Sequence, residues 1–139
     1  MEKEYLIKSK NDTAKIAKEY AKLFQKGDII ALYGDLGVGK TFFVQSVCQE
    51  LGIKETVNSP SYVLLNQYNG DFLIKHYDLY RLQFTEEVYE LGIFEDLEKA
   101  IIFIEWPQIA ESILPAKTWF FRFEYHGKTQ RKLHIIRNI

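Results

Sequence analysis

The chain has 139 residues and a mass of 16.4 kDa, a size that fits one domain. Hydrophobic residues make up 47% and charged residues 27%, close to the averages of globular domains. No stretch reaches the about 18 consecutive apolar residues of a membrane span, and a formal net charge of −1 argues against autonomous, non-specific nucleic-acid binding. The single cysteine, Cys48, excludes an internal disulfide and is compatible with a reducing cytosol.

The first third of the chain predicts alternating strands and helices. Residues 5–7 predict a short strand, and residues 12–25 predict a helix because their apolar positions recur at helical spacing. Gly27 suits the end of that helix. Three residues could cap its start: Ser9, Asn11 and Asp12. Residues 28–33 form the near-continuous apolar run of a strand covered on both faces, and residues 40–51 predict a second helix.

The rest of the chain predicts five further strands, at residues 62–68, 72–78, 101–104, 118–125 and 132–136. Asn69-Gly70 is a strong hairpin signal between the first two, and His126-Gly127 joins the last two. Thr85 could cap a short helix that has two acidic residues in its first turn. We therefore expect a single α/β domain over residues 1–139, with a mostly parallel central sheet, flanking helices and antiparallel hairpin additions.

A phosphate-binding motif follows the second predicted strand. The pattern G-x-x-x-x-G-K-[ST] is matched by Gly34, Gly39, Lys40 and Thr41. Glycines let successive backbone N–H groups surround phosphates, Lys40 can reach the β- and γ-phosphates, and the Thr41 hydroxyl can ligate magnesium. A buried strand leads into the loop and a helix leaves it, which is the context that the motif requires. The sequence therefore predicts a P-loop that binds ATP or ADP with magnesium.

A P-loop needs a carboxylate near the metal, normally after an apolar strand. Glu105 directly follows the apolar run 101–104, and Asp78 ends the second strand of the first hairpin. Ligands of open α/β sheets bind at the carboxyl ends of strands, so both residues are candidates. Which of the two touches the metal stays open. His76 shares a strand face with Asp78, and it could be a structural hydrogen-bonding residue or a general base.

Charge is distributed unevenly along the second half. Residues 86–111 contain eight acidic residues and one basic residue, whereas residues 117–139 contain six basic residues and one acidic residue. These segments could be two solvated faces, or they could form a docking surface for an acidic partner or RNA.

With these residues in place, the chain resembles the TsaE family (older name YjeE), which are small bacterial P-loop ATPases. The resemblance covers nearly the whole chain and rests on five tracts, at residues 34–41, 58–62, 76–82, 91–96 and 104–107. It implies a cytoplasmic role in forming N6-threonylcarbamoyladenosine in tRNA. The implied partners are the TsaD–TsaB pair, with tRNA contacted only through that complex.

The resemblance also implies residue roles. Thr41, Glu105 and Asp78 would form the metal site, and Lys40, Asp78 and Glu105 would be catalytic. Residues 58–62 would form a switch-like loop, Thr13 would lie near the base, and Trp106 would lie beside the site, although it could also be a plain rim aromatic. The expected nucleotide-binding residues are Thr13, Gly34, Asp35, Leu36, Gly37, Val38, Gly39, Lys40, Thr41, Phe42, Ser61 and Trp106.

Hydrolysis by the isolated chain is expected to be slow. The chain has only four arginines, and none lies in an evident lid, so a partner would complete the charge around the γ-phosphate. Two rival functions share the P-loop: a small-molecule kinase, and a nucleotide-sensing adaptor that binds without hydrolysis.

Overall fold

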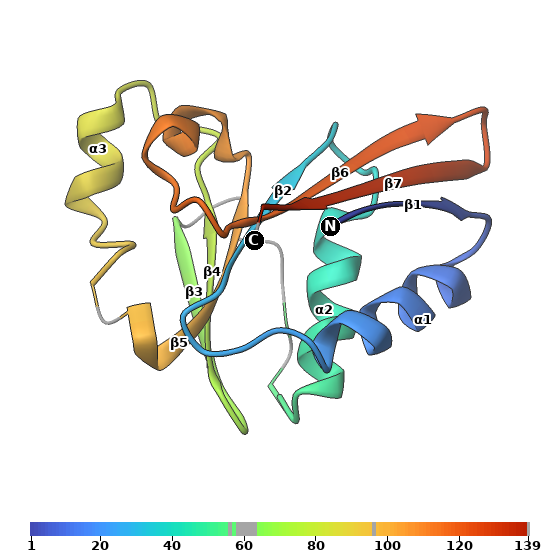
Figure 1. Ribbon diagram of the computed structural model, residues 1–139, viewed down its shortest axis with the longest axis horizontal. Helices are drawn as coiled ribbons and strands as arrows, with labels where there is room; N and C mark the ends of the chain where they lie inside the picture. The colour runs from blue at the N-terminus through green and yellow to red at the C-terminus, as the bar shows by residue number, and fades with distance from the viewer. Residues whose placement is uncertain (56, 58–63, 96, 139) are drawn as a thin grey trace.

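A computed structural model describes residues 1–55, 57, 64–95 and 97–138. They form one seven-stranded mixed sheet in the order β1-β7-β6-β2-β5-β4-β3, with helices on both faces (Figure 1). The strands are β1 (Glu2–Ile7), β2 (Ile29–Tyr33), β3 (Leu65–Asn69), β4 (Leu73–Asp78), β5 (Ala100–Glu105), β6 (Trp119–His126) and β7 (Gln130–Arg137). The α-helices are α1 (Lys10–Ala21), α2 (Lys40–Glu50) and α3 (Thr85–Glu90), and the 3₁₀ helices are η1 (Leu97–Lys99) and η2 (Pro107–Ile113).

The centre of the sheet is parallel and its two edges are antiparallel. Strands β6, β2, β5 and β4 run parallel, whereas β3, β7 and β1 add antiparallel partners at the margins. Every residue of β2 and β5 is buried, which explains why both sequences are almost continuously apolar. The predicted fold class, an α/β domain with a mostly parallel central sheet and antiparallel additions, is confirmed.

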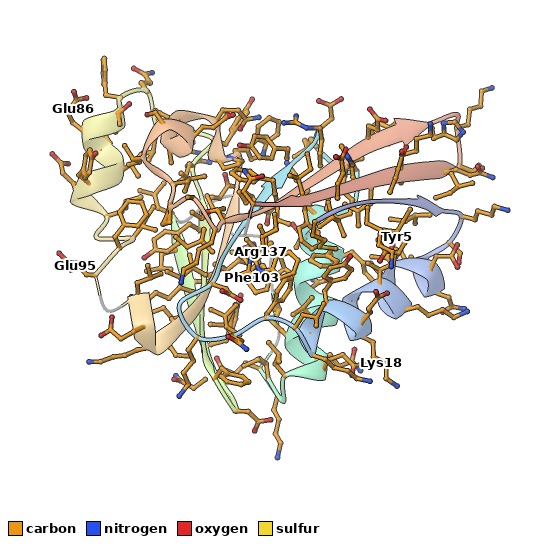
Figure 2. All side chains as sticks on the ribbon, in the orientation of Figure 1. Tyr5, Lys18, Glu86, Glu95, Phe103 and Arg137 are labelled. Atoms are coloured by element: carbon orange, nitrogen blue, oxygen red, sulfur yellow. The ribbon has the colours of Figure 1, made fainter. Side chains whose placement is uncertain are left out.

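Two hydrophobic layers hold the sheet between its helices. On one face α1 and α2 pack through an aromatic cluster of Tyr20, Phe24, Phe43, Phe103 and Phe121. The other face packs against the segment around α3 and η2, and its core includes Val88, Ile102, Ile104 and Ala110. Figure 2 shows side chains filling the space on both sides of the sheet, with Phe103 near the middle of the molecule.

Helix α1 differs from its prediction at both ends. It begins at Lys10, and the N-cap is Ser9, whose hydroxyl accepts a hydrogen bond from the Asp12 N–H. It ends at Ala21 rather than at residue 25, because the Asp28 carboxylate accepts the Gln25 N–H and turns the chain toward β2. The apolar spacing continues past the helix because Phe24 packs into the core from the turn.

The predicted cap of α3 is wrong. Thr85 is the first helical residue, and Phe84 occupies the N-cap position. A Phe side chain cannot accept a hydrogen bond, so the Phe84 carbonyl accepts the Glu87 N–H. The Glu87 carboxylate in turn accepts the N–H groups of Gln83 and Phe84, which fixes the chain entering the helix.

Both predicted hairpins are present. Strands β3 and β4 flank Asn69-Gly70, and residues 127–129 connect β6 to β7. The predicted start of the first hairpin strand, residues 62 and 63, lies outside the described residues. No helix in the described part of the chain combines the length and apolar character that a membrane crossing requires.

Candidate nucleotide site

The phosphate-binding loop joins β2 to α2 at the carboxyl edge of the parallel strands. Gly34 opens the loop at φ 145°, where an added Cβ would lie 2.8 Å from the Phe123 carbonyl oxygen. Gly39 closes it in a left-handed conformation, at φ 118°, directly before the first residue of α2. The N–H groups of the first helical turn therefore face the loop, as anion binding requires.

Lys40 is held inside the loop. Its side chain is only 4% exposed, its ammonium donates to the Gly34 carbonyl, and its Nζ lies 3.8 Å from the centroid of the Trp106 ring. Burial lowers the pKa of Lys40, and the nearby carboxylates of Glu105 and Asp78 act in the opposite direction. A buried ammonium beside a glycine loop is a favourable place for a phosphate to bind.

Two carboxylates end neighbouring parallel strands. Asp78 on β4 is directly paired with Glu105 on β5, and both side chains are almost fully buried. Thr41, in the first turn of α2, places its hydroxyl 3.3 Å from Oε1 and 3.2 Å from Oε2 of Glu105. The strand register therefore brings Thr41, Asp78 and Glu105 together from three different elements.

Asp78 is buried and only partly compensated. Burial raises the pKa of its carboxyl group, and the Tyr80 backbone N–H, which donates to Oδ1 at 2.9 Å, opposes that rise. The neighbouring Glu105 charge raises the pKa of Asp78 further. A raised pKa makes the Asp78 carboxylate a stronger proton acceptor.

Trp106 closes one side of the site. It has φ 54° and ψ 57° between β5 and η2, and it has the only positive φ of a non-glycine residue in the described part of the chain. Its ring packs against Tyr80 at an interplanar angle of 55°, with centroids 4.8 Å apart, and it covers the Lys40 ammonium. Strained backbone of this kind persists where the surroundings over-determine it, and it clusters at ligand sites.

Two hollows flank the loop. The first encloses about 230 Å³, and the described residues that line it were all predicted from the sequence: Leu36, Gly37, Gly39, Lys40, Thr41, Phe42, Asp78, Glu105 and Trp106. The second, of about 250 Å³, is lined by Ile7, Ser9, Lys10, Thr13, Gly37, Val38, Gly39, Phe42, Thr129 and Arg131. Gly37, Gly39 and Phe42 line both hollows, so the two hollows adjoin across the loop. This shape suits a ligand with phosphates at one end and a base at the other.

Comparison with known proteins identifies the family. The family model described as threonylcarbamoyl adenosine biosynthesis protein TsaE matches residues 7–133. The chain belongs to the TsaE family. The family resemblance predicted from the sequence is therefore confirmed.

Named relatives cover most of the chain. A Rickettsia felis protein named tRNA threonylcarbamoyladenosine biosynthesis protein TsaE is 38% identical over 135 residues, which are 96% of this chain and 79% of the relative. A Bacillus subtilis protein of the same name is 33% identical over 124 residues, covering 88% of this chain and 77% of the relative. The crystal structure of Bacillus subtilis YdiB superposes with a TM-score of 0.83 at 26% identity, covering 99% of this chain and 86% of YdiB.

The remaining predicted residues of this TsaE chain fall in three places. Thr13 lies on α1 and lines the second hollow, whereas Asp35 lies exposed in the loop and its carbonyl accepts the Val38 N–H. Ser61 and the predicted switch-like loop at residues 58–62 lie outside the described residues.

Sequence reasoning missed part of the second hollow. Thr129 and Arg131 reach it from the β6–β7 hairpin, and Lys10 contributes from α1 with its Nζ 5.2 Å from the centroid of the Phe42 ring. The Tyr125 hydroxyl also donates to the Leu36 carbonyl at 3.0 Å, which ties the hairpin to the loop. The basic character of the C-terminal segment was visible in the sequence, but its position beside the loop was not.

The oxygen donors at the strand ends are of the kind that magnesium takes. Among the described residues there is no group of three or more His, Cys, Asp or Glu side chains that could hold a metal ion. Magnesium is commonly held by one or two carboxylates together with substrate phosphates and waters, so Thr41, Asp78 and Glu105 are the residues that could hold it.

Proposed function

We propose that this TsaE-family chain binds ATP or ADP with magnesium, and that it hydrolyses ATP slowly in support of tRNA threonylcarbamoyladenosine formation. The observation that supports this most directly is the convergence of Lys40, Thr41, Asp78 and Glu105 on one hollow beside a glycine loop. The family is that of a threonylcarbamoyl adenosine biosynthesis protein, which gives the nucleotide site its biological setting.

In phosphoryl transfer to water, four residues of the chain would have different roles. Lys40 would exchange its contact with the Gly34 carbonyl for a phosphate oxygen. Thr41 and Glu105 would hold the metal or its waters, and Asp78 or Glu105 would orient the attacking water. Bound magnesium would neutralise charge on the β- and γ-phosphates.

We expect slow ATP hydrolysis because no arginine among the described residues lines the phosphate hollow. None of the chain's four arginines lines the phosphate hollow within the described residues, although Arg131 lines the second hollow. In related chemistry an added arginine accelerates hydrolysis by about 10³–10⁵-fold. We therefore propose that the TsaD–TsaB pair activates the chain in the cytoplasm, and that tRNA is contacted only through this complex.

The adaptor and the kinase remain rival functions for the same hollow. Asp78→Asn removes a proton acceptor while preserving the shape of the side chain, so an ATPase should lose most of its phosphate release and keep its affinity for metal-free nucleotide. Phosphate release by wild-type and Asp78→Asn chains, with nucleotide binding measured by calorimetry, tests this. A nucleotide-binding wild type that does not hydrolyse even with TsaD–TsaB favours the adaptor. Turnover that requires an added hydroxylated acceptor favours the kinase.

A further inference from the structure

A buried histidine lies beneath the carboxylates of the proposed site. His76 on β4 is fully buried and shares a strand face with Asp78, one pleat further into the sheet. Its register partner is Phe103, and the two rings meet edge to face with centroids 6.5 Å apart. His76 does not line the phosphate hollow. It can therefore affect a bound nucleotide only through another residue.

That residue is Glu105. The Nε2 atom of His76 lies 2.6 Å from Glu105 Oε2, which is a short hydrogen bond between buried groups. A carboxylate can only accept, so the hydrogen-bond network assigns the proton of the ring to Nε2. The other ring nitrogen, Nδ1, is buried and has no hydrogen-bond partner among the described residues. An unpaired polar atom in a buried position costs free energy that an apolar side chain would avoid.

His76 also makes the two oxygens of the Glu105 carboxylate unequal in their hydrogen bonds. Oε2 accepts from His76 and also lies 3.2 Å from the Thr41 hydroxyl, whereas among the described residues Oε1 has only the Thr41 hydroxyl, 3.3 Å away. Fixing Oε2 from below leaves Oε1 as the oxygen with more capacity for a metal or a metal-bound water. Residues behind a ligating carboxylate commonly set its orientation in this way.

We propose that His76 is a positioning residue that fixes the Glu105 carboxylate for magnesium. This inference rests on the proposed function, because it assigns Glu105 to the metal site. His76 does not touch the nucleotide, so its loss should weaken the metal without weakening metal-free nucleotide binding.

The chain offers a conservative variant and a matched control. His76→Gln places an amide N–H near the position of Nε2, whereas His76→Leu fills similar volume without a donor. His134 forms a comparable pair with Glu2, at 2.8 Å, but on the exposed edge of the sheet. His134→Leu therefore removes a histidine–glutamate hydrogen bond that β6 and β2 separate from Glu105 on β5.

The test measures Mn²⁺ binding to the ADP complex by electron paramagnetic resonance, and ADP binding without metal by calorimetry. We expect His76→Leu to weaken Mn²⁺ binding by about 10-fold or more, His76→Gln to restore most of it, and His134→Leu to change nothing. Metal-free ADP affinity should stay within about twofold in all three variants. In addition, ¹⁵N NMR of the wild type should show the Nε2-protonated tautomer of His76.

Unchanged Mn²⁺ affinity in His76→Leu would overturn this inference and leave the proposed function standing. An equal loss of metal-free ADP binding, not rescued by His76→Gln, would also overturn it by indicating a purely structural role. The NMR measurement needs no variant, so a ring that carries its proton on Nδ1 and none on Nε2 overturns the inference even if His76→Leu does not fold. A wild type that binds ADP but no Mn²⁺ would remove the metal site and this inference together.

Discussion

Lys40 and Trp106 form a cation–π contact at the candidate site. A nearly buried ammonium lies against the face of an indole, and the backbone of that tryptophan is in the left-handed region. The ring therefore covers the cation that a phosphate would approach. An arriving phosphate must compete with the ring or share the ammonium with it.

Nucleotide binding should consequently change the fluorescence of Trp106. The chain's other tryptophan, Trp119, is 3% exposed in the core and should not respond. We expect Mg-ADP to alter the emission of the wild type and to leave Trp106→Phe almost unchanged, while calorimetry confirms that the variant still binds. An equal fluorescence change in Trp106→Phe would contradict this placement of the ring.

Cys48 provides a pH-dependent test of packing behind the loop. It lies fully buried on α2, and burial raises the pKa of its thiol to about 12. A raised pKa keeps the thiol protonated, and the thiolate is the reactive form, so at pH 8 the folded chain should resist a disulfide reagent. Denaturant should restore rapid labelling. Fast labelling of the folded chain at pH 8 would show that α2 is less tightly packed.

Individual site residues could be predicted from the sequence where they belong to a motif or follow an apolar run. Lys40, Thr41 and Glu105 were predicted on those grounds, and they do meet. The bond between His76 and Glu105 was not predicted, because it depends on which strands are neighbours and in which register. No local pattern carries that information.

At the scale of elements, the loop depends on glycines for two different reasons. Gly34 and Gly39 both have φ values that side chains rarely adopt. At Gly34 a Cβ would also lie 2.7 Å from Val38 Cγ1 and 2.8 Å from the Phe123 carbonyl, whereas at Gly39 it would meet nothing within 4 Å. A side chain at position 39 would therefore only strain the backbone. A side chain at position 34 would strain the backbone and also collide with the Phe123 carbonyl.

Alanine at these positions should separate the two effects. We expect Gly39→Ala to lower the free energy of unfolding by about 1–3 kcal/mol, which is the usual cost of such strain. Gly34→Ala should cost more than Gly39→Ala, because the backbone of β6 cannot move aside cheaply. Chemical denaturation of both variants measures the difference, and equal losses would contradict the close approach of the loop to Phe123.

Elements were predicted well where periodicity or turn chemistry was strong. The Asn69-Gly70 hairpin and the strand before the P-loop are examples. The end of α1 was placed too late because Phe24 continues the helical spacing although it lies in a turn. The pairing of β6 with β2, which brings the C-terminal hairpin beside the loop, is a long-range contact that the sequence does not encode locally.

Across the whole molecule, a partly buried ion pair joins the C-terminal strand to the start of β2. Arg137 donates to Asp28 at 3.1 Å and to the Lys117 carbonyl, and its guanidinium lies over the Trp119 ring at 4.4 Å. Asp28 also accepts hydrogen bonds from the Gln25 N–H and the Trp119 indole. The pair therefore connects β7, β6 and the turn after α1.

Removing one partner should be costly. We expect Arg137→Ala to lower the free energy of unfolding by about 3 kcal/mol, because it leaves the Asp28 carboxylate buried without its cation. Lys132→Ala is the matched control, since it removes an exposed ion pair with Glu4 from the same strand and should cost no more than about 1 kcal/mol. Similar losses in the two variants, measured by urea denaturation, would argue against a special role for Arg137.

The charged segments lie on different parts of the molecule. Acidic residues such as Glu86 and Glu95 lie on and just beyond α3, whereas basic residues follow the β6–β7 hairpin (Figure 2). One of those basic residues, Arg131, lines the second hollow beside the loop.

The most direct test of the account is phosphate release from Mg-ATP by this chain, measured alone and with the TsaD–TsaB pair of the same organism, beside Lys40→Ala. The account predicts release well below about one per second for the chain alone, a clear increase with the pair, and a loss of roughly 100-fold or more in Lys40→Ala. Release at many per second by the chain alone, or release that is indifferent to the pair, would contradict a partner-activated ATPase.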